Sequence, residues 1–227
     1  MLGRTALVTG ANRGLGLAVA GQLASSGYQV VVAAREEADA VRAAVALGRN
    51  QARWVRLDVT DPDSVARACA SVPEVDILVN NAGVLLDWQQ APTTVPLPLV
   101  QRELEVNVLG AWRMAQAYVP GMISRGWGRV VMVSSGTASF TNGLFPGAPG
   151  YALSKTALNA LTVLLATETR GTGVLVNAVN PGLVRTRMRP DATRTPEEAA
   201  KDVVWAATLD DDGPTGAFLR SGQVISW

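Results

Sequence analysis

The chain has 227 residues, of which 48% are hydrophobic and 17% are charged, and it contains no histidine. These values are typical of one globular domain, and the net charge of +1 gives no electrostatic reason to expect a nucleic acid or an anionic membrane as a partner. The absence of histidine excludes Ser-His-Asp triads and histidine-ligated metal sites, and we expect no metal centre. The single cysteine, Cys69, cannot form an internal disulfide, and neither an export signal nor a long apolar run is visible. We therefore expect a cytoplasmic protein without a membrane span.

A strand, a glycine-rich turn and a helix are predicted at the beginning of the chain. Residues 5–9 form a short apolar, β-branched run, Gly10-Ala-Asn-Arg-Gly14-Leu-Gly16 follows at once, and an amphipathic stretch continues through Ser26. Glycines permit positive φ and let a phosphate approach the backbone, while the unpaired N–H groups of a helix start attract a pyrophosphate. The spacing Gly-x-x-x-Gly-x-Gly differs from the general dinucleotide fingerprint Gly-x-Gly-x-x-Gly, but it indicates the same kind of site.

Further apolar runs of strand length alternate with helical patterns along the rest of the chain. They cover residues 29–34, 53–58, 76–80, 129–134, 174–180 and 218–225. Several are apolar on both faces, as expected when helices cover a parallel sheet from either side. This predicts an α/β fold with a doubly wound parallel sheet in a single domain, residues 1–227, because no repeat or linker divides the chain. A helix capped by Asp61 should open at Asp61-Pro62, and the proline-containing loop 86–98 should form a rim of the active site.

Tyr151 and Lys155 have the spacing that places a phenol and an ammonium side by side on a helix. A phenol with a pKa near 10 is a sluggish acid at neutral pH, and a cation within about 4–6 Å stabilises its phenolate and lowers that pKa. The pair can therefore act as a tuned proton donor. The alternative is a helical surface pair without function.

Taken in order, the motifs of this chain resemble those of the short-chain dehydrogenase/reductase family. Its members carry Thr-Gly-x-x-x-Gly-x-Gly, Asn-Asn-Ala-Gly, an active-site Asn, a Ser, Tyr-x-x-x-Lys and Pro-Gly. Here these motifs are Thr9 to Gly16, Asn80 to Gly83, Asn107, Ser135, Tyr151 with Lys155, and Pro181-Gly182. The ending, residues 213–227, is similar to that of carbonyl reductase-like members. The resemblance implies a Rossmann-type sheet of seven strands in the order 3-2-1-4-5-6-7, with the site outside the carboxyl ends of the strands.

The resemblance also implies a nicotinamide dinucleotide as cofactor and suggests which residues contact it. The expected cofactor-binding residues are Gly10, Asn12, Arg13, Gly14, Leu15, Gly16, Arg35, Asp58, Val59, Asn81, Ala82, Gly83, Tyr151, Lys155, Pro181, Gly182, Val184 and Thr186. NAD-specific folds usually present a carboxylate at the end of the second strand, whereas an arginine there accommodates a 2′-phosphate. Arg35 occupies that place and Arg13 lies in the glycine turn, so we expect NADPH. The alternative is that Arg35 pairs with Glu36 or Glu37 at the surface.

Four residues are expected to carry the chemistry: Asn107, Ser135, Tyr151 and Lys155. Ser135 and Tyr151 would donate hydrogen bonds to a developing alkoxide, and Tyr151 would deliver its proton. The resemblance implies that Lys155 binds the ribose of the nicotinamide and that Asn107 holds a water connecting Lys155 to solvent. The separation of Ser135 from Tyr151 is longer than is usual in the family, which leaves Ser134 and Thr137 open as alternatives. For Asn107, simple exposure on a helix is the alternative.

The expected function is NADPH-dependent reduction of a small hydrophobic ketone or aldehyde. Apolar walls would come from residues 84–88, residues 136–150 and Met188, and residues 186–196 would form a short substrate lid that leaves the pocket open. Arg187 and Arg189 could instead anchor an anionic group of the substrate. A non-catalytic NADP(H)-binding regulator, an alcohol dehydrogenase and a ketoacyl reductase of the same family are competing interpretations. The sequence leaves open whether the chain forms a homo-oligomer.

Overall fold

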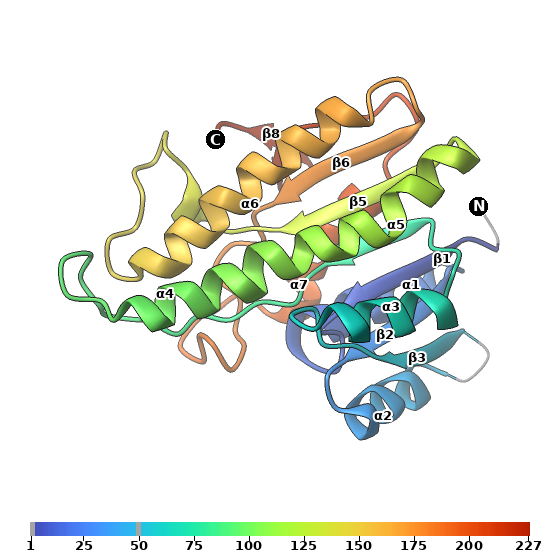
Figure 1. Ribbon diagram of the computed structural model, residues 1–227, viewed down its shortest axis with the longest axis horizontal. Coiled ribbons are helices and arrows are strands. Elements are labelled where there is room, and N and C mark those ends of the chain that lie inside the picture. The colour runs from blue at the N-terminus through green and yellow to red at the C-terminus, as the bar shows by residue number, and fades with distance from the viewer. Residues whose placement is uncertain (1–2, 49–50) are drawn as a thin grey trace.

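An eight-stranded sheet forms the centre of the protein in the computed structural model, which describes residues 3–48 and 51–227 (Figure 1). The strands lie in the order β3-β2-β1-β4-β5-β6-β7-β8. Their bounds are β1 Thr5–Thr9, β2 Gln29–Ala34, β3 Ala52–Arg56, β4 Ile77–Asn80, β5 Gly128–Val133, β6 Val174–Val179, β7 Phe218–Arg220 and β8 Gln223–Ile225. Strands β1 to β7 are parallel to one another, so their carboxyl ends meet at one edge of the sheet, on the left in Figure 1. The predicted doubly wound, Rossmann-type fold is confirmed.

Helices cover both faces of this sheet. Helices α1 (Gly14–Ser25), α2 (Glu37–Leu47) and α7 (Pro196–Ala207) lie on one face; α3 (Pro62–Ser71), α5 (Ala111–Arg125) and α6 (Pro149–Glu168) lie on the other (Figure 1). Helix α4 (Leu97–Leu104) continues through a π-helical turn, η1 (Glu105–Gly110), into α5. Because helices pack on both sides, successive residues such as Val30, Val31 and Val32 are all fully buried. This explains why the strands are continuous apolar runs rather than alternating ones.

The last predicted strand, residues 218–225, is wrong as a single element. The chain forms a hairpin there, with β8 antiparallel to β7, so the sheet has eight strands instead of seven. Ser221 and Gly222 between them both have positive φ, +49° and +73°. Two successive residues of this kind form the tight turn that matches the twist of paired strands, and they reverse the chain.

Side-chain caps mark the start of two helices, and the cap of α3 was expected from the sequence. Asp61 caps α3 by accepting a hydrogen bond from the Asp63 N–H at 2.9 Å, with Pro62 in the first turn. Thr195 and Glu198 form a reciprocal capping box at the start of α7.

Within the ranges that the structure describes, no helix is both long enough and apolar enough to cross a bilayer.

Candidate functional site

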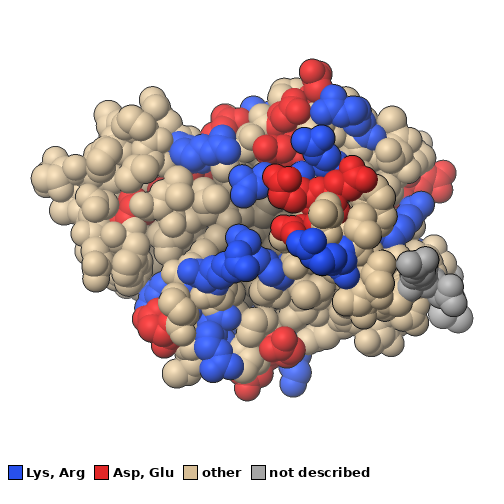
Figure 2. Space-filling model, turned by 90° about the horizontal axis from the view of Figure 1, so that it is seen from below, with Lys and Arg blue, Asp and Glu red and all other residues tan. Residues whose placement is uncertain are grey.

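A cavity of about 670 Å³ opens at the carboxyl ends of the parallel strands. Every residue expected to bind a cofactor lines it, and so do Ser135, Tyr151 and Lys155. Seen from below, the molecular surface is hollowed near its middle, and Lys and Arg side chains border the hollow (Figure 2). The cationic residues that line the cavity are Arg13, Arg35, Arg102, Lys155, Arg187 and Arg189. The sheet thus brings together residues that are far apart in the sequence, in a site suited to an anionic ligand.

The glycine turn between β1 and α1 leaves the backbone accessible from the cavity. Gly10 and Gly14 have positive φ, +65° and +53°. A Cβ on Gly16 would collide with Asn81 Nδ2 and would lie 2.6 Å from the Gly10 carbonyl oxygen, so the turn is closed to side chains at this position. Arg13 is the N-cap of α1, but its side chain makes no capping hydrogen bond. The first N–H groups of α1 therefore lack a side-chain acceptor, which is the arrangement that a phosphate group requires.

Thr9 and Asn81 hold this turn against the end of β4. The Thr9 hydroxyl accepts hydrogen bonds from the N–H groups of Asn81 (3.0 Å) and Ala82 (2.9 Å), and it donates to the Val79 carbonyl at 3.3 Å. The Asn81 amide donates to the Thr9 carbonyl at 2.8 Å and to the Gly10 carbonyl at 3.3 Å. Side chains thus satisfy backbone groups that the glycine turn leaves unpaired.

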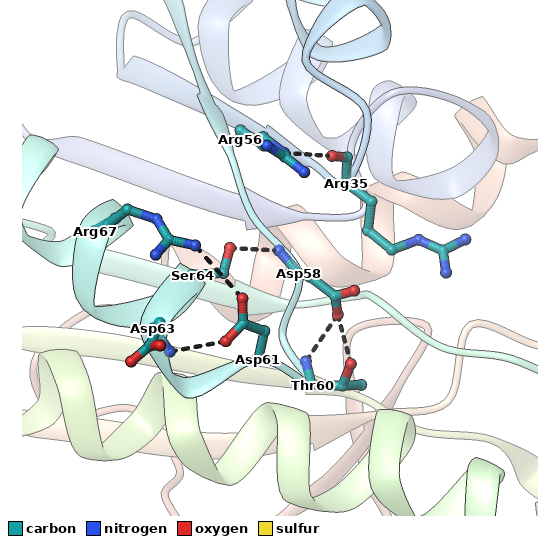
Figure 3. Close-up of polar contacts among 8 residues, drawn as sticks. All are labelled: Arg35, Arg56, Asp58, Thr60, Asp61, Asp63, Ser64 and Arg67. Atoms are coloured by element: carbon teal, nitrogen blue, oxygen red, sulfur yellow. Dashed lines mark hydrogen bonds and ion pairs between the residues drawn. The ribbon is translucent and has the colours of Figure 1, made fainter.

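Arg35 and Asp58 lie just after β2 and β3, at one end of the cavity (Figure 3). The Arg35 carbonyl accepts from Arg56 Nε at 3.3 Å, while its guanidinium forms no ion pair with any residue in the described parts of the chain, including Glu36 and Glu37. Asp58 Oδ1 accepts hydrogen bonds from the Thr60 N–H (2.9 Å) and hydroxyl (2.7 Å). Burial acts to raise the pKa of Asp58, but these hydrogen bonds and the nearby charge of Arg35 outweigh it and hold the pKa below its usual value. Asp58 is therefore a hydrogen-bond acceptor at neutral pH.

Three hydroxyl groups follow β5, and the structure distinguishes between them. Ser134 is buried and donates its hydroxyl proton to Asn159 Oδ1 at 2.6 Å, so that proton is already engaged. Thr137 donates to Ser135 Oγ through its N–H (3.2 Å) and its hydroxyl (3.0 Å). Ser135 lies within hydrogen-bonding reach of the Tyr151 phenol. The geometry therefore favours Ser135 over Ser134 and Thr137 as the partner of the phenol.

Tyr151 and Lys155 lie on the first two turns of α6, and desolvation controls both pKa values. Burial raises the pKa of Tyr151 to about 12, and the hydrogen bond with Ser135 acts in the opposite direction. Burial also lowers the pKa of Lys155 to about 8. Lys155 Nζ lies 5.7 Å from the centroid of the phenol ring and donates to the Val133 carbonyl at 2.8 Å. The expected direction of the Tyr151 shift is wrong for this structure, because the cost of burying a phenolate, together with the nearby charge of Glu103, outweighs the hydrogen bonding to Ser135.

Asn107 lies in the π-helical turn η1, where short π segments are often found at functional sites. It is 1% exposed, so the alternative of a solvent-exposed helix residue is wrong. Its Oδ1 accepts from the Val84 N–H at 2.8 Å, and its Nδ2 donates to the Val84 carbonyl (2.9 Å) and to Ser154 Oγ (2.9 Å). A Cβ on Gly83 would lie 3.2 Å from Asn107 Oδ1 and 3.5 Å from Lys155 Nζ. Asn107 therefore joins the segment after β4 to α6 beside Lys155 and does not itself line the cavity; its role in holding a water stays a prediction.

The segment between β6 and α7 forms one wall of the cavity. Gly182 has a φ of +75°, which turns the chain directly after Pro181. Arg194 donates to the Pro181 carbonyl at 2.6 Å and forms an ion pair with Asp202 at 2.9 Å. Val184 and Arg194 pair as an isolated parallel bridge, so the two ends of the expected lid are held together at its base.

The tip of this segment is attached to the opposite wall of the cavity. The Arg189 guanidinium lies over the Trp88 ring, 4.2 Å from its centroid, and forms an ion pair with Asp191 at 2.7 Å. Trp88 in turn stacks on Phe145 with ring centroids 5.5 Å apart. Arg189 is therefore committed to protein partners, whereas Arg187 makes no ion pair with any described residue.

Comparison with known proteins identifies the family. The model of the short chain dehydrogenase family matches residues 4–197. The chain belongs to the short-chain dehydrogenase/reductase family. It is therefore an oxidoreductase of a family that binds nicotinamide cofactors.

Relatives of this family align along almost the whole chain. Oxidoreductase UcpA of Escherichia coli O157:H7 is 36% identical, covering 98% of this chain and 89% of its own. The 3-oxoacyl-[acyl-carrier-protein] reductase FabG of Vibrio cholerae is 34% identical, covering 97% and 91%. Among solved structures, a short chain dehydrogenase/reductase family protein has a TM-score of 0.88 at 37% identity, covering 96% and 95%. A gluconate 5-dehydrogenase from Burkholderia cenocepacia, in complex with NADP and tartrate, has a TM-score of 0.86 at 26% identity, covering 96% and 93%.

Sequence reasoning missed three polar residues behind the cavity: Asp87, Glu103 and Ser154. Ser154 lies inside the Tyr-Ala-Leu-Ser-Lys run and contacts Asn107, so its place in the motif could have indicated it. Asp87 and Glu103 are both fully buried. Each has a weak signal in the sequence. Asp87 directly follows the apolar Val84-Leu-Leu86, and Glu103 lies one turn before Asn107 on a predicted helix.

Proposed function

We propose that this enzyme uses NADPH to reduce the carbonyl group of a small hydrophobic ketone or aldehyde, with Tyr151 as the proton donor. The observation that carries the proposal is the convergence of Ser135, Tyr151 and Lys155 on a cavity that also opens onto the glycine turn. The residues expected to bind the cofactor and the residues expected to donate the proton thus line the same cavity.

The charges after β2 support NADPH over NADH. Arg13 and Arg35 line the cavity, and neither guanidinium forms an ion pair with the residues described. Asp39, the carboxylate of α2 that lines the same wall, accepts from Asn12 at 3.1 Å and also forms an ion pair with Arg42. Glu36 also lines the cavity and has no ion pair with the residues described, so this wall carries two free guanidinium groups and one free carboxylate. That balance suits a 2′-phosphate better than a ribose hydroxyl.

The residues present fit a nicotinamide dinucleotide along the whole cavity. The open N–H groups at the start of α1 suit its pyrophosphate, Asp58 and Val59 would border the adenine, and Pro181, Gly182, Val184 and Thr186 would border the nicotinamide. When bound, the reduced nicotinamide supplies the hydride that reduces the carbonyl carbon.

The side chains of this protein would supply the proton and stabilise the charge on oxygen. With a pKa raised to about 12, Tyr151 remains protonated at neutral pH and can donate to a carbonyl oxygen together with Ser135. After transfer, Lys155, whose Nζ lies 5.7 Å from the ring centroid of Tyr151, would stabilise the new phenolate, because with a pKa of about 8 it is mainly charged at neutral pH. Asn107 would position the site by holding Val84 and Ser154.

The walls next to Tyr151 suggest a hydrophobic substrate. Val84, Leu85, Trp88, Ala148 and Met188 line this part of the cavity. Such walls orient a substrate through contact area and discriminate weakly between molecules that differ by one methylene, by about 1–3 kcal/mol. We therefore expect activity on several hydrophobic carbonyl compounds.

The test compares Tyr151→Phe with Tyr118→Phe. NADPH consumption would be measured with a panel containing acetophenone, benzaldehyde, a quinone and an acetoacetyl thioester, and NADPH binding would be measured by fluorescence. Tyr151→Phe should bind NADPH normally but lose a factor of about 10² or more in turnover, because it lacks the proton donor. Tyr118→Phe makes the same change at a buried hydroxyl that has no hydrogen-bond partner among the described residues, and it should be fully active.

The outcomes separate the competing functions. Normal turnover by Tyr151→Phe would refute the mechanism. NADPH binding without consumption on any member of the panel would favour a nucleotide-binding regulator, whereas exclusive activity on the thioester would favour a ketoacyl reductase like the relative from Vibrio cholerae.

A further inference from the structure

Two carboxyl groups without a cation lie behind the proposed active site. Asp87, in the segment after β4, and Glu103, on α4, are each 0% exposed. Asp87 Oδ2 accepts from the Gly150 N–H at 2.5 Å, and Glu103 Oε1 accepts from the Leu86 N–H at 2.6 Å. The second oxygen of each group, Asp87 Oδ1 and Glu103 Oε2, has no hydrogen-bond partner within the described residues. Two buried acceptors are thus left unsatisfied side by side, which is costly unless a donor lies between them.

The two carboxyl groups contact each other and the same point of α6. Their side chains are within hydrogen-bonding reach. A Cβ on Gly150 would collide with Glu103 Oε2 and would lie 3.1 Å from Asp87 Oδ2. Gly150 directly precedes Tyr151, so both carboxyl groups abut the turn that carries the proposed proton donor.

The charges around Asp87 and Glu103 decide whether both groups can be ionised. Neither carboxyl group forms an ion pair with an Arg or Lys in the ranges described. The titratable groups that face Glu103 from the elements packed against it are Asp87, on the segment after β4, and Tyr151, on α6. Two ionised carboxylates in contact, with no cation and no water-exposed surface, would repel each other strongly.

We propose that Asp87 and Glu103 share a single proton, and that this carboxylic acid–carboxylate pair positions Tyr151 by holding the start of α6 against the segment after β4. One O–H between the groups satisfies both unpaired oxygens at once. The remaining negative charge belongs on Asp87, because Asp87 accepts from the first turn of α6, whose N-cap residue Ala148 provides no capping side chain. The proton then belongs on Glu103, whose pKa is raised to about 7 by burial and by the neighbouring charge of Asp87.

The consequence for the site rests on the proposed role of Tyr151. Loss of the shared proton above neutral pH would place a second negative charge beside Tyr151, and ionised Glu103 acts to raise the pKa of that phenol. Repulsion would also separate Asp87 from Glu103, and the residue after Asp87 is Trp88, the cavity wall that stacks on Phe145. Deprotonation of the pair should therefore impair turnover while leaving cofactor binding intact, since neither carboxyl group lines the cavity.

The experiment replaces Glu103 by glutamine, with Glu105→Gln as the matched control. The amide introduced by Glu103→Gln would accept from Leu86 and donate to Asp87 without titrating. Glu105 is two residues away, only partly buried and paired with Arg113 at 2.8 Å, so its substitution makes the same chemical change outside the pair. The first readout is the infrared C=O band of a protonated carboxyl group, recorded near pH 6 on the protein alone. The second readout is the pH profile of kcat for the best substrate of the carbonyl panel. KM for NADPH is measured at the same time and reports on cofactor binding.

The protonated-carboxyl band should be present in the wild type and in Glu105→Gln and absent in Glu103→Gln. Wild-type kcat should decline above about pH 7, by up to roughly tenfold per pH unit for one ionising group. The Glu103→Gln profile should lack this decline and begin to fall only near pH 8, where Lys155 loses its charge. KM for NADPH should not change. If Glu103→Gln fails to fold, Asp87→Asn keeps the acceptor for Gly150 and removes the like charge, so the band should disappear at a lower pH than in the wild type.

Absence of the band in the wild type, or its persistence in Glu103→Gln, would overturn the shared proton. A band that behaves as expected, together with superimposable kcat profiles for the wild type and Glu103→Gln, would overturn the positioning of Tyr151. Because the infrared readout needs no substrate, failure of the proposed reductase function would leave the test of the shared proton intact.

Discussion

Replacement of Thr9 by valine tests whether one buried hydroxyl group holds the glycine turn in place. Valine has nearly the same shape, so packing is preserved while three hydrogen bonds are removed. The Ala82 N–H would lose its acceptor at 2.9 Å, whereas the Asn81 N–H would keep the Val79 carbonyl at 3.0 Å. An unsatisfied buried N–H costs about 1–3 kcal/mol of stability. The Asn81 N–H, which loses one of its two acceptors, adds about 1 kcal/mol or less to this loss. Thr9 is 1% exposed, so we expect the free energy of unfolding to fall by roughly 2–3 kcal/mol.

Thermal and urea unfolding of the protein without cofactor would measure this loss. For a domain of this size about 1 kcal/mol corresponds to roughly 2–4 °C, so Tm should fall by roughly 4–12 °C. Thr9→Ser is the control, because it keeps the hydroxyl and loses one methyl group, at a cost of about 1 kcal/mol. NADPH affinity should fall in the valine variant and not in the serine variant, since Gly10 and Ala82 both line the cavity. A valine variant within about 0.5 kcal/mol of the wild type, with unchanged NADPH affinity, would refute the role of the hydroxyl.

Two further predictions concern ligand selectivity. Arg35→Ala should weaken NADPH binding by roughly 1–3 kcal/mol and leave NADH binding unchanged, because the lost contact is to the 2′-phosphate; titration with both nucleotides measures this, and equal affinities in the wild type would contradict it. Acetophenone should be reduced with a kcat/KM at least comparable to that of its para-carboxylate, because Arg189 is already paired with Asp191 and stacked on Trp88. A roughly 10³-fold preference for the carboxylate, abolished by Arg187→Ala, would show instead that the pocket selects an anionic group.

Local sequence patterns were sufficient for most of the architecture and for the cofactor side of the site. The strand at residues 29–34 is apolar on both of its faces after the first residue. Such a strand is stable only between two layers of helices, so the pattern predicts a parallel sheet. Parallel strands then bring their carboxyl ends to one edge, which is why motifs as distant as the glycine turn and Pro181-Gly182 line one cavity.

Two features of the structure were not expected from the sequence. Residues 218–225 have the composition of one strand, yet positive φ at Ser221 and Gly222 turns them into a hairpin that adds β8 to the sheet. Asn107 has a helical pattern around it, but its amide is satisfied by Val84 and Ser154 from other segments, within a π turn. The Ser221-Gly222 dipeptide is a local turn signal that the expectation of a single strand left out. The partners of the Asn107 amide have no such local signal, because they lie in segments that meet only when the chain has folded.

The sequence by itself determined which groups are available for chemistry: a phenol, an ammonium, hydroxyl groups and amides, with no imidazole. It also determined the i, i+4 spacing that places Tyr151 and Lys155 on one side of α6, since this depends only on helix geometry. Only the tertiary structure decided their electrostatics. Burial raises the pKa of Tyr151 and lowers that of Lys155. Burial and the neighbouring charge of Asp87, which lies in a different segment of the chain, raise the pKa of Glu103. The free energy of a charge depends on the solvent and the charges around it, and these are established only when segments distant in the sequence pack together.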